Sequence, residues 1–230
     1  MAQIDHQTAD VTWQQSGVPV STRFDDPYYS LENGLAETDH TFLSGNDLPA
    51  RFADGFHVAE LGFGTGLNLI ATLRAWRGAG VRGRLHYTSF EAYPLTQEAA
   101  LKALAAFPDL TALTAELAPL WKSAEGTLDL PDLCVRIVLG DARETLPQWG
   151  GTADAWFLDG FSPAKNPELW DAALLRRVGQ HTRPGGTCAT YTAAGAVRRA
   201  LAAAGFEVER VPGYGRKRHM TRGRLVEQTA

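Results

Sequence analysis

Apolar residues recur along the chain with two different periods, and the alternation of these periods predicts the fold. From residue 57 onward, short apolar runs alternate with segments whose apolar residues recur every three or four positions. We predict strands at 57–61, 84–90, 134–139, 154–158, 187–191, 206–211 and 224–227, and helices at 66–77, 96–107, 111–121, 167–178 and 193–204. Strands that alternate with helices in this way predict an α/β domain with a doubly wound, mostly parallel sheet.

The first 55 residues have a different composition, rich in Asp, Asn, Gly, Ser and aromatic residues, with short alternating pieces. We interpret residues 1–55 as a β-rich N-terminal extension of hairpin-like strands and loops. This extension is expected to pack on a core domain formed by residues 56–230, so that the whole chain makes one structural unit.

A glycine-rich loop follows the first predicted core strand and opens a helix. It reads Glu60-Leu61-Gly62-Phe63-Gly64-Thr65-Gly66. A dinucleotide fingerprint requires a third glycine at position 67, which is Leu67, and the chain has no Gly-Lys-Ser/Thr of a P-loop. The pattern acid-x-Gly-x-Gly-x-Gly is instead typical of class I S-adenosylmethionine-dependent methyltransferases.

Two further acids stand at the ends of the next strands, where ligands of doubly wound sheets bind. Glu91 ends the second strand and can accept hydrogen bonds from a ribose diol, although NAD enzymes place an acid at the same point and a surface acid is an alternative. Asp141, followed by Ala142, ends the third strand, where it can bind an adenine amino group, cap a helix, or do both. Three strand ends that carry these groups in order indicate an adenosine-containing cofactor.

The fourth strand ends at Asp159, in the run 154–167. At this point of the fold the carboxylate can face the transferable methyl group and accept hydrogen bonds from an attacking amine. Phe161 can form a wall of the pocket and Lys165 can reach a phosphate or the substrate. Asp-Gly and Ser-Pro are also ordinary turn pairs, so a purely structural turn is the alternative.

Composition and charge limit the possible classes of protein. Hydrophobic residues make up 44% and charged residues 21% of the chain, as in folded globular proteins. No apolar run approaches the roughly 18 residues that span a membrane, no signal peptide is visible, and the two cysteines, Cys134 and Cys188, lie in apolar runs typical of buried free thiols. We therefore expect a cytoplasmic protein without a membrane partner, and no metal site.

The net charge of −4 argues against a nucleic-acid partner, whereas the distribution of charge along the chain favours one. The segment 210–224 carries six basic residues and no acidic one. Such a patch can bind phosphates on an acidic protein, or it can be a solvated chain end.

Several long strings of the chain resemble the methyltransferase domain of the MnmC family, tRNA 5-methylaminomethyl-2-thiouridine biosynthesis proteins. The most specific is Asp154-Ala155-Trp156-Phe157-Leu158-Asp159-Gly160-Phe161-Ser162-Pro163-Ala164-Lys165-Asn166-Pro167-Glu168-Leu169-Trp170. Similar strings lie at 24–30, 33–38, 62–68, 90–96, 183–187 and 213–218, so the resemblance covers nearly the whole chain.

The resemblance implies a class I (Rossmann-like) methyltransferase that transfers a methyl group from S-adenosylmethionine to the amine of 5-aminomethyl(-2-thio)uridine at the tRNA wobble position. The residues that it implies fall into three groups. Asp159 would orient the amine first and act as its base second; the cofactor would be held by Glu60, Gly62, Gly64, Thr65, Gly66, Asn68, Glu91, Asp141 and Ala142; and the tRNA anticodon loop would contact Tyr28, Phe161, Lys165, Arg216, Lys217 and Arg218.

Bifunctional members of this family continue into an FAD-dependent oxidase that exposes the amine, whereas this sequence stops at residue 230. We therefore expect a stand-alone form served by a separate enzyme, with a domain cut from a longer protein as the alternative. Three other functions are compatible with the fold: an aminopropyltransferase, a small-molecule or protein amine methyltransferase, and a non-catalytic RNA-binding subunit.

Overall fold

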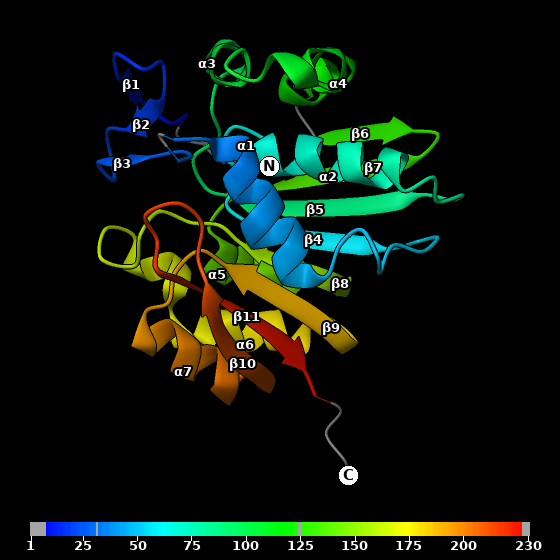
Figure 1. Ribbon diagram of the computed structural model, residues 1–230, viewed down its shortest axis with the longest axis vertical. Helices are drawn as coiled ribbons and strands as arrows, with labels where there is room; N and C mark the ends of the chain where they lie inside the picture. Colours follow the sequence, from blue (N-terminus) through cyan, green and yellow to red (C-terminus); the bar gives the residue numbers. More distant parts are fainter. Residues whose placement is uncertain (1–7, 31, 124–125, 227–230) are drawn as a thin grey trace, which may run out of the picture.

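The computed structural model describes residues 8–30, 32–123 and 126–226. Its main feature is an eight-stranded sheet with the order β10-β11-β9-β8-β4-β5-β7-β6 (Figure 1). Five central strands are parallel: β4 (His57–Leu61), β5 (Leu85–Glu91), β7 (Leu133–Leu139), β8 (Ala153–Leu158) and β9 (Thr182–Thr190). The predicted doubly wound, mostly parallel sheet is confirmed.

Antiparallel strands close both edges of the sheet. β6 (Thr127–Leu130) pairs with β7 at one edge, and β11 (His219–Leu225) pairs with both β9 and β10 (Phe206–Pro212) at the other. Along the chain, β4 is followed by β5 on one side and later by β8 on the other. The order therefore reverses beside β4, and the carboxyl ends of β4, β5 and β8 meet at this switch point, where ligands bind in such sheets.

Helices cover both faces of the sheet and bury two separate apolar clusters. Trp156 and Phe157 are adjacent in β8 and point to opposite faces, as successive side chains of a strand do, so each lies in a different cluster. The helices are α2 (Leu67–Gly78), α3 (Gln97–Leu104), α4 (Thr111–Leu117), α5 (Ala142–Thr145), α6 (Ala172–Gln180) and α7 (Gly195–Ala203), and the 3-10 turns are η3 (Pro108–Leu110), η4 (Ala118–Lys122), η5 (Leu146–Gln148) and η6 (Pro167–Trp170).

The N-terminal extension is β-rich only in its first half. β1 (Val11–Trp13), β2 (Pro19–Ser21) and β3 (Asp26–Pro27) form a small antiparallel sheet, as predicted. The second half is helical, with α1 (Gly34–Thr38), the π-helical η1 (Asp39–Leu43) and the 3-10 turn η2 (Ser44–Asn46), so the prediction of hairpins and loops is wrong there. Asn33 caps α1 through its side chain, and Phe42 and Leu43 are buried in the core.

Other predictions of secondary structure and burial also need correction. Residues 167–178 do not form one helix, because the Asp171 side chain accepts hydrogen bonds from the amides of Ala173 and Leu174 and so starts α6 after η6. The strand β6 was not predicted, and β9 and β11 begin five residues earlier than their predicted starts at 187 and 224. Of the two free cysteines, Cys188 is buried and Cys134 only half-buried.

Among the described residues, no helix is long and apolar enough to span a membrane.

Candidate cofactor-binding and active site

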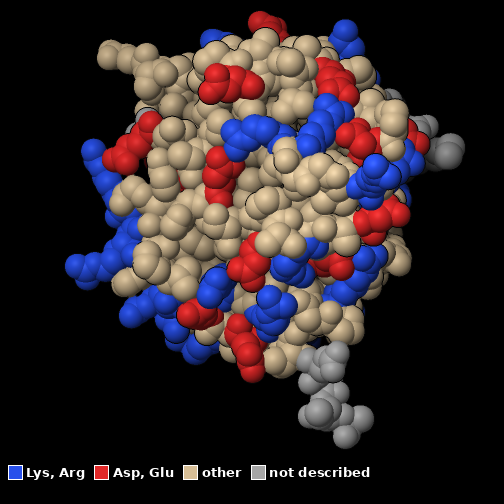
Figure 2. All heavy atoms as spheres, turned by 45° about the vertical axis from the view of Figure 1, so that its right-hand side comes forward, with Lys and Arg blue, Asp and Glu red and all other residues tan. Residues whose placement is uncertain are grey.

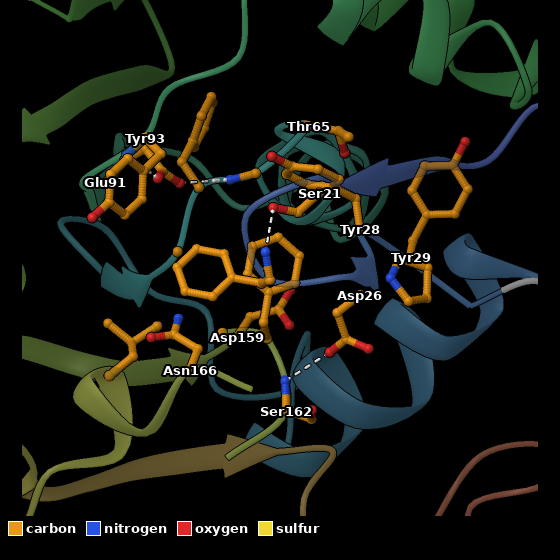
Figure 3. Close-up of a pocket in the computed structure, with 18 of the residues that line it drawn as sticks. Ser21, Asp26, Tyr28, Tyr29, Thr65, Glu91, Tyr93, Asp159, Ser162 and Asn166 are labelled. Atoms are coloured by element: carbon orange, nitrogen blue, oxygen red, sulfur yellow. Dashed lines mark hydrogen bonds between the residues drawn. The ribbon is translucent and has the colours of Figure 1, made fainter. Parts of the chain in front are cut away.

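A cavity of about 670 Å³ opens at the carboxyl ends of the central strands. Ligand pockets in proteins commonly have volumes of roughly 300–1,000 Å³. Its walls come from the N-terminal sheet, α1, the glycine-rich loop, the ends of β5, β7, β8 and β9, and the loop between β10 and β11. In Figure 3, Glu91 and Tyr93 lie on one side of the cavity and Asp26 and Tyr29 on the other, with Asp159 between them.

The glycine-rich loop requires glycine because of its backbone shape and its close neighbours. Gly62 has a φ of 89°, and a Cβ there would lie 2.1 Å from the Asp159 carbonyl oxygen. Gly64, with a φ of 52°, faces the Tyr28 ring, 3.3 Å from the position of an added Cβ. Gly62, Gly64 and Thr65 line the cavity as predicted, whereas Gly66 lies behind the wall against Trp121.

Glu91 is half-buried at the end of β5 and is held by backbone amides. One carboxylate oxygen accepts from the Gly64 amide at 3.0 Å and the other from the Tyr93 amide at 2.8 Å. Burial raises the pKa of Glu91, and the backbone hydrogen bonds act against this rise. Each carboxylate oxygen keeps a lone pair for a further donor, so the side chain can accept both hydroxyls of a diol.

Asp141 and Ala142 also line the cavity, at the start of α5. The Asp141 carboxylate accepts from the Arg143 amide at 2.8 Å and from its guanidinium at 2.6 Å. These hydrogen bonds are the largest cause of a lowered pKa at Asp141. The carboxylate is therefore ionised at neutral pH and available to an amino group in the cavity.

Asp159 stands where β8 leaves the sheet. Its backbone amide donates to the Leu61 carbonyl at 3.0 Å, and its carboxylate accepts from the Asn68 side-chain amide at 2.7 Å. Burial is the main cause that raises the pKa of Asp159 to about 7, and the nearby Glu37 raises it further, whereas Asn68 and Lys217 lower it. A carboxylate with this pKa can both carry charge and accept a proton near neutral pH.

Glu60 does not reach the cavity wall, contrary to its predicted contact with the cofactor. It is completely buried and hydrogen-bonds to Asn68 at 2.9 Å and to the Ser89 hydroxyl at 2.7 Å. Burial raises the pKa of Glu60 to about 8. The Asn68 amide, whose oxygen accepts from Thr38 at 2.8 Å, thus joins Glu60 to Asp159, although Asn68 itself still borders the cavity.

Aromatic side chains form the outer wall of the cavity. The rings of Phe24 and Phe161 are stacked with centroids 4.9 Å apart, and Tyr28 meets Phe161 edge-on at 5.1 Å. Phe24 also contacts Tyr93 at 5.8 Å. Tyr28 and Phe161, two predicted substrate contacts, line the cavity. Phe24 also lines it but was not predicted as a site residue, although it begins the string 24–30 that resembles the family.

Three of the four predicted phosphate-binding residues, Lys165, Arg216 and Lys217, form ion pairs with carboxylates of this chain. Lys165 lies outside the cavity wall and binds the Asp25 carbonyl and, at 3.6 Å, the Asp26 carboxylate, so it anchors the N-terminal sheet. Lys217 pairs with Glu37 at 2.6 Å inside the cavity.

Arg216 pairs with Glu32 at 2.9 Å, although its side chain is 94% exposed. Arg218 lies outside the cavity wall, is exposed, and forms no ion pair with any residue that the structure describes.

Comparison with known proteins identifies the class of protein. A protein-family profile described as "S-adenosyl-L-methionine-dependent methyltransferase" matches residues 110–226, just over half of the chain. The chain therefore belongs to the S-adenosylmethionine-dependent methyltransferase family.

Individual relatives point to one branch of this family. The chain is 44% identical to the tRNA 5-methylaminomethyl-2-thiouridine biosynthesis bifunctional protein MnmC of Stutzerimonas stutzeri and 46% identical to that of Aeromonas hydrophila, over 100% and 99% of this chain. It spans only 36% and 37% of the length of these relatives. The solved structure of MNMC2 from Aquifex aeolicus superposes with a TM-score of 0.74 at 24% identity, covering 99% of this chain and 75% of that one, which shows a common fold.

The cofactor of the family is S-adenosylmethionine, and the residues at the cavity fit it. The two free lone pairs of Glu91 suit the ribose hydroxyls, and the ionised Asp141 suits the adenine amino group. We predict that the loop at 62–65 and Asn68 border the remaining part of the cofactor, which leaves Asp159 for the methyl acceptor.

Proposed function

We propose that this chain methylates the amine of 5-aminomethyl(-2-thio)uridine at the wobble position of tRNA, to give 5-methylaminomethyl(-2-thio)uridine. The observation that carries the proposal is the Asp159 carboxylate, which faces the cofactor cavity with a pKa of about 7. The names of the MnmC relatives support a tRNA uridine as the acceptor, although this chain spans about a third of their length.

When bound, S-adenosylmethionine supplies an activated methyl group to an attacking nitrogen. The Asp159 carboxylate would accept a hydrogen bond from the amine and so aim its lone pair. It would then take the proton that the nitrogen loses as the new N–C bond forms. Asn68 holds one Asp159 oxygen at 2.7 Å, which leaves the other free for the amine.

The distribution of charge supports a nucleic-acid substrate. Residues 172–226 contain 11 basic residues (Lys and Arg) but only 2 acidic ones (Asp and Glu). Residues 1–171 contain 11 basic and 23 acidic residues. Arg199 lies in the first half of α7, and Arg210 and Arg218 lie on β10 and the loop before β11. All three are exposed, Arg218 follows the cavity-lining Lys217, and Arg210 pairs with Thr221, whose partner on β9 is its last residue, Thr190.

In Figure 2, Lys and Arg side chains project along the lower left margin of the molecule and outnumber Asp and Glu there. We propose that Arg199, Arg210 and Arg218 hold the phosphates on either side of the target nucleotide. A wobble base lies in a single-stranded loop, so the base itself can turn out of the loop and enter the cavity. Phe161 and Tyr28 would then contact the base.

A tRNA substrate would place the reaction in the cytoplasm. The aminomethyl group would have to be exposed by an earlier reaction, carried out by a separate enzyme or by another domain.

The direct test is transfer of labelled methyl from S-adenosylmethionine to tRNA from cells that lack this gene, followed by nucleoside analysis. We expect label in methylaminomethyluridine, and much less of it with Asp159→Asn. If only small amines became labelled, the methyl acceptor would be a small molecule and not tRNA. Formation of methylthioadenosine from decarboxylated S-adenosylmethionine would identify an aminopropyltransferase, and cofactor binding without turnover would identify a binding subunit.

The phosphate contacts have their own test. The triple variant Arg199→Gln, Arg210→Gln, Arg218→Gln should weaken tRNA binding and reduce the dependence of the binding constant on salt by about 2–3 in log–log slope. The triple variant Arg82→Gln, Lys122→Gln, Arg136→Gln removes three exposed positive charges outside residues 172–226 and serves as the matched control. An unchanged slope in the first triple variant would remove these contacts from the proposal.

A further inference from the structure

An ion pair between the buried Glu37 and the more exposed Lys217 lies at one side of the cavity, near Asp159. Lys217, in the loop between β10 and β11, reaches across to Glu37 of α1, and its Nζ lies 2.6 Å from the Glu37 carboxylate. The same Nζ lies 4.0 Å above the centre of the Tyr191 ring. The Tyr191 hydroxyl donates at 2.6 Å to the carbonyl of Gly160, the residue after Asp159. Lys217 is thus fixed from two sides.

All four side chains border the same cavity: Glu37, Asp159, Tyr191 and Lys217. Glu37 is 8% exposed, so its charge is little screened by water, and it needs a partner. Counted together, Glu37 and Lys217 cancel, and Asp26 is paired with Lys165, whereas Asp159 forms no ion pair with any described residue and keeps an uncompensated charge. The titratable and charged groups that line this end of the cavity are Asp26 of β3, Glu32 before α1, Glu37 of α1, Tyr191 after β9, and Tyr214, Arg216 and Lys217 of the loop between β10 and β11. Glu60 of β4 and Tyr87 of β5 are buried behind the wall.

We propose that Lys217 is a positioning residue for methyl transfer, which neutralises Glu37 and thereby lets a neutral amine bind beside an ionised Asp159. The proposal rests on the amine acceptor of the proposed function. It also moves Lys217 from the tRNA phosphates, where the sequence suggested it, into the active site.

The chemical reason lies in the protonation of the acceptor. A primary amine with a pKa near that of lysine, about 10, is almost entirely ammonium at pH 7, and ammonium has no lone pair for attack. A carboxylate nearby stabilises the ammonium, and two carboxylates stabilise it more. Without Lys217, Glu37 and Asp159 would both face the amine. The two carboxylates would then keep the amine protonated as ammonium, or Asp159 would itself be protonated and could no longer accept a hydrogen bond or a proton from the amine.

The first test measures the titration of Asp159 itself and needs no acceptor. Carbon-detected NMR of the aspartate side chains, assigned with Asp159→Asn, gives the pKa of Asp159 in each variant. We expect Lys217→Met to raise this pKa by at least about half a unit, and the double variant Lys217→Met, Glu37→Gln to bring it back toward the wild-type value. Lys217→Arg keeps the charge and should shift it little.

Arg218→Met is the matched control, because it removes the neighbouring positive charge from outside the cavity wall. Its Asp159 titration should equal that of the wild type. If Lys217→Met leaves the pKa of Asp159 unchanged, or if Glu37→Gln does not reverse the change, the proposal is overturned. This result stands even if tRNA proves not to be the acceptor.

The second test follows turnover. In Lys217→Met, kcat at pH 7 should fall at least about tenfold and the acidic limb of the pH–rate profile should move to higher pH, while the double variant recovers part of the rate. A residue that only held phosphates would instead raise KM for tRNA and lower its salt dependence, and Glu37→Gln would not restore the loss. That pattern would return Lys217 to the tRNA surface.

Discussion

Replacement of Asp159 by Asn is expected to stabilise the fold at alkaline pH while it removes most of the methyl transfer. Burial raises the pKa of Asp159 from 3.8 to about 7. A folded state with a raised carboxyl pKa binds the proton more tightly than the unfolded state does. The folded state therefore loses stability as the pH rises from about 4 to about 7. Asparagine carries no charge and escapes this loss.

The size of the effect follows from the shift of about three pKa units. Each unit corresponds to about 1.4 kcal/mol, so the wild type would lose at most about 4 kcal/mol above pH 7. The substitution also has a cost, because Asn68 donates to Asp159 and an amide can accept that bond with only one of its two atoms. Allowing about 1–2 kcal/mol for a weakened hydrogen bond leaves an expected net gain of about 2 kcal/mol at pH 8.

Urea unfolding of the protein without cofactor, at pH 5 and pH 8, checks this expectation. The destabilisation of the folded state by the Asp159 charge should be about a third as large at pH 5 as at pH 8. At pH 5 the free energy of unfolding of the variant should therefore be close to that of the wild type or slightly below it. Asp141→Asn is the control with the opposite sign, because hydrogen bonds from Arg143 lower the pKa of Asp141. That variant should be destabilised at pH 8. If Asp159→Asn gained equally at both pH values, or lost stability at pH 8, burial of the charge would not explain the site.

Three other changes test separate parts of the cavity. Gly62→Ala places a Cβ 2.1 Å from the Asp159 carbonyl oxygen at a residue with a φ of 89°. Methyl transfer should therefore fall more than about tenfold, and the free energy of unfolding should fall by roughly 1–3 kcal/mol. Gly17→Ala is the control, because Gly17 has a φ of 81° but no atom within 4 Å of the added Cβ, so only the smaller backbone strain should appear. Glu91→Gln should weaken cofactor binding by roughly 10-fold to 100-fold in calorimetry with kcat less affected, and equal loss in both would contradict a ribose contact. Lys165→Ala frees Asp25 and Asp26 and should raise KM for S-adenosylmethionine a few-fold without changing the salt dependence of tRNA binding, which a phosphate contact would change.

The sequence was sufficient to predict the groups that stand at strand ends. In a parallel sheet the carboxyl ends of neighbouring strands lie at the same edge, so local motifs at separate strand ends must converge. Glu91, Asp141 and Asp159 satisfy this condition, and all three line one cavity. The strand–loop–helix context of Gly62 and Gly64 likewise placed the backbone at the cavity, because both glycines adopt positive φ angles beside a ligand space.

Side chains whose partners lie far away in the sequence were not predictable in this way. Lys217 pairs with Glu37, 180 positions earlier, and Lys165 binds Asp25, 140 positions earlier. A lysine in a basic or turn-rich segment gives no sign of either partner, so Lys217 was predicted to bind phosphates and Lys165 to bind a phosphate or the substrate. The prediction that Glu60 contacts the cofactor was wrong for a different reason. Its position in the motif is that of a cofactor ligand, but its side chain points under the loop and accepts a hydrogen bond from Asn68.

The N-terminal extension is a part of the cavity and not an appendage to it. α1 supplies Glu37, which holds Lys217, and Thr38, which donates at 2.8 Å to the Asn68 oxygen and fixes the amide that holds Asp159. The Asp26 carboxylate accepts from the Ser162 amide at 2.8 Å, so β3 is tied to the loop that follows Asp159 (Figure 3). Three bonds from the extension therefore reach the surroundings of a single carboxylate. Because a carboxylate in this position opposes folding at neutral pH, its geometry needs support from outside the sheet, and the extension provides that support.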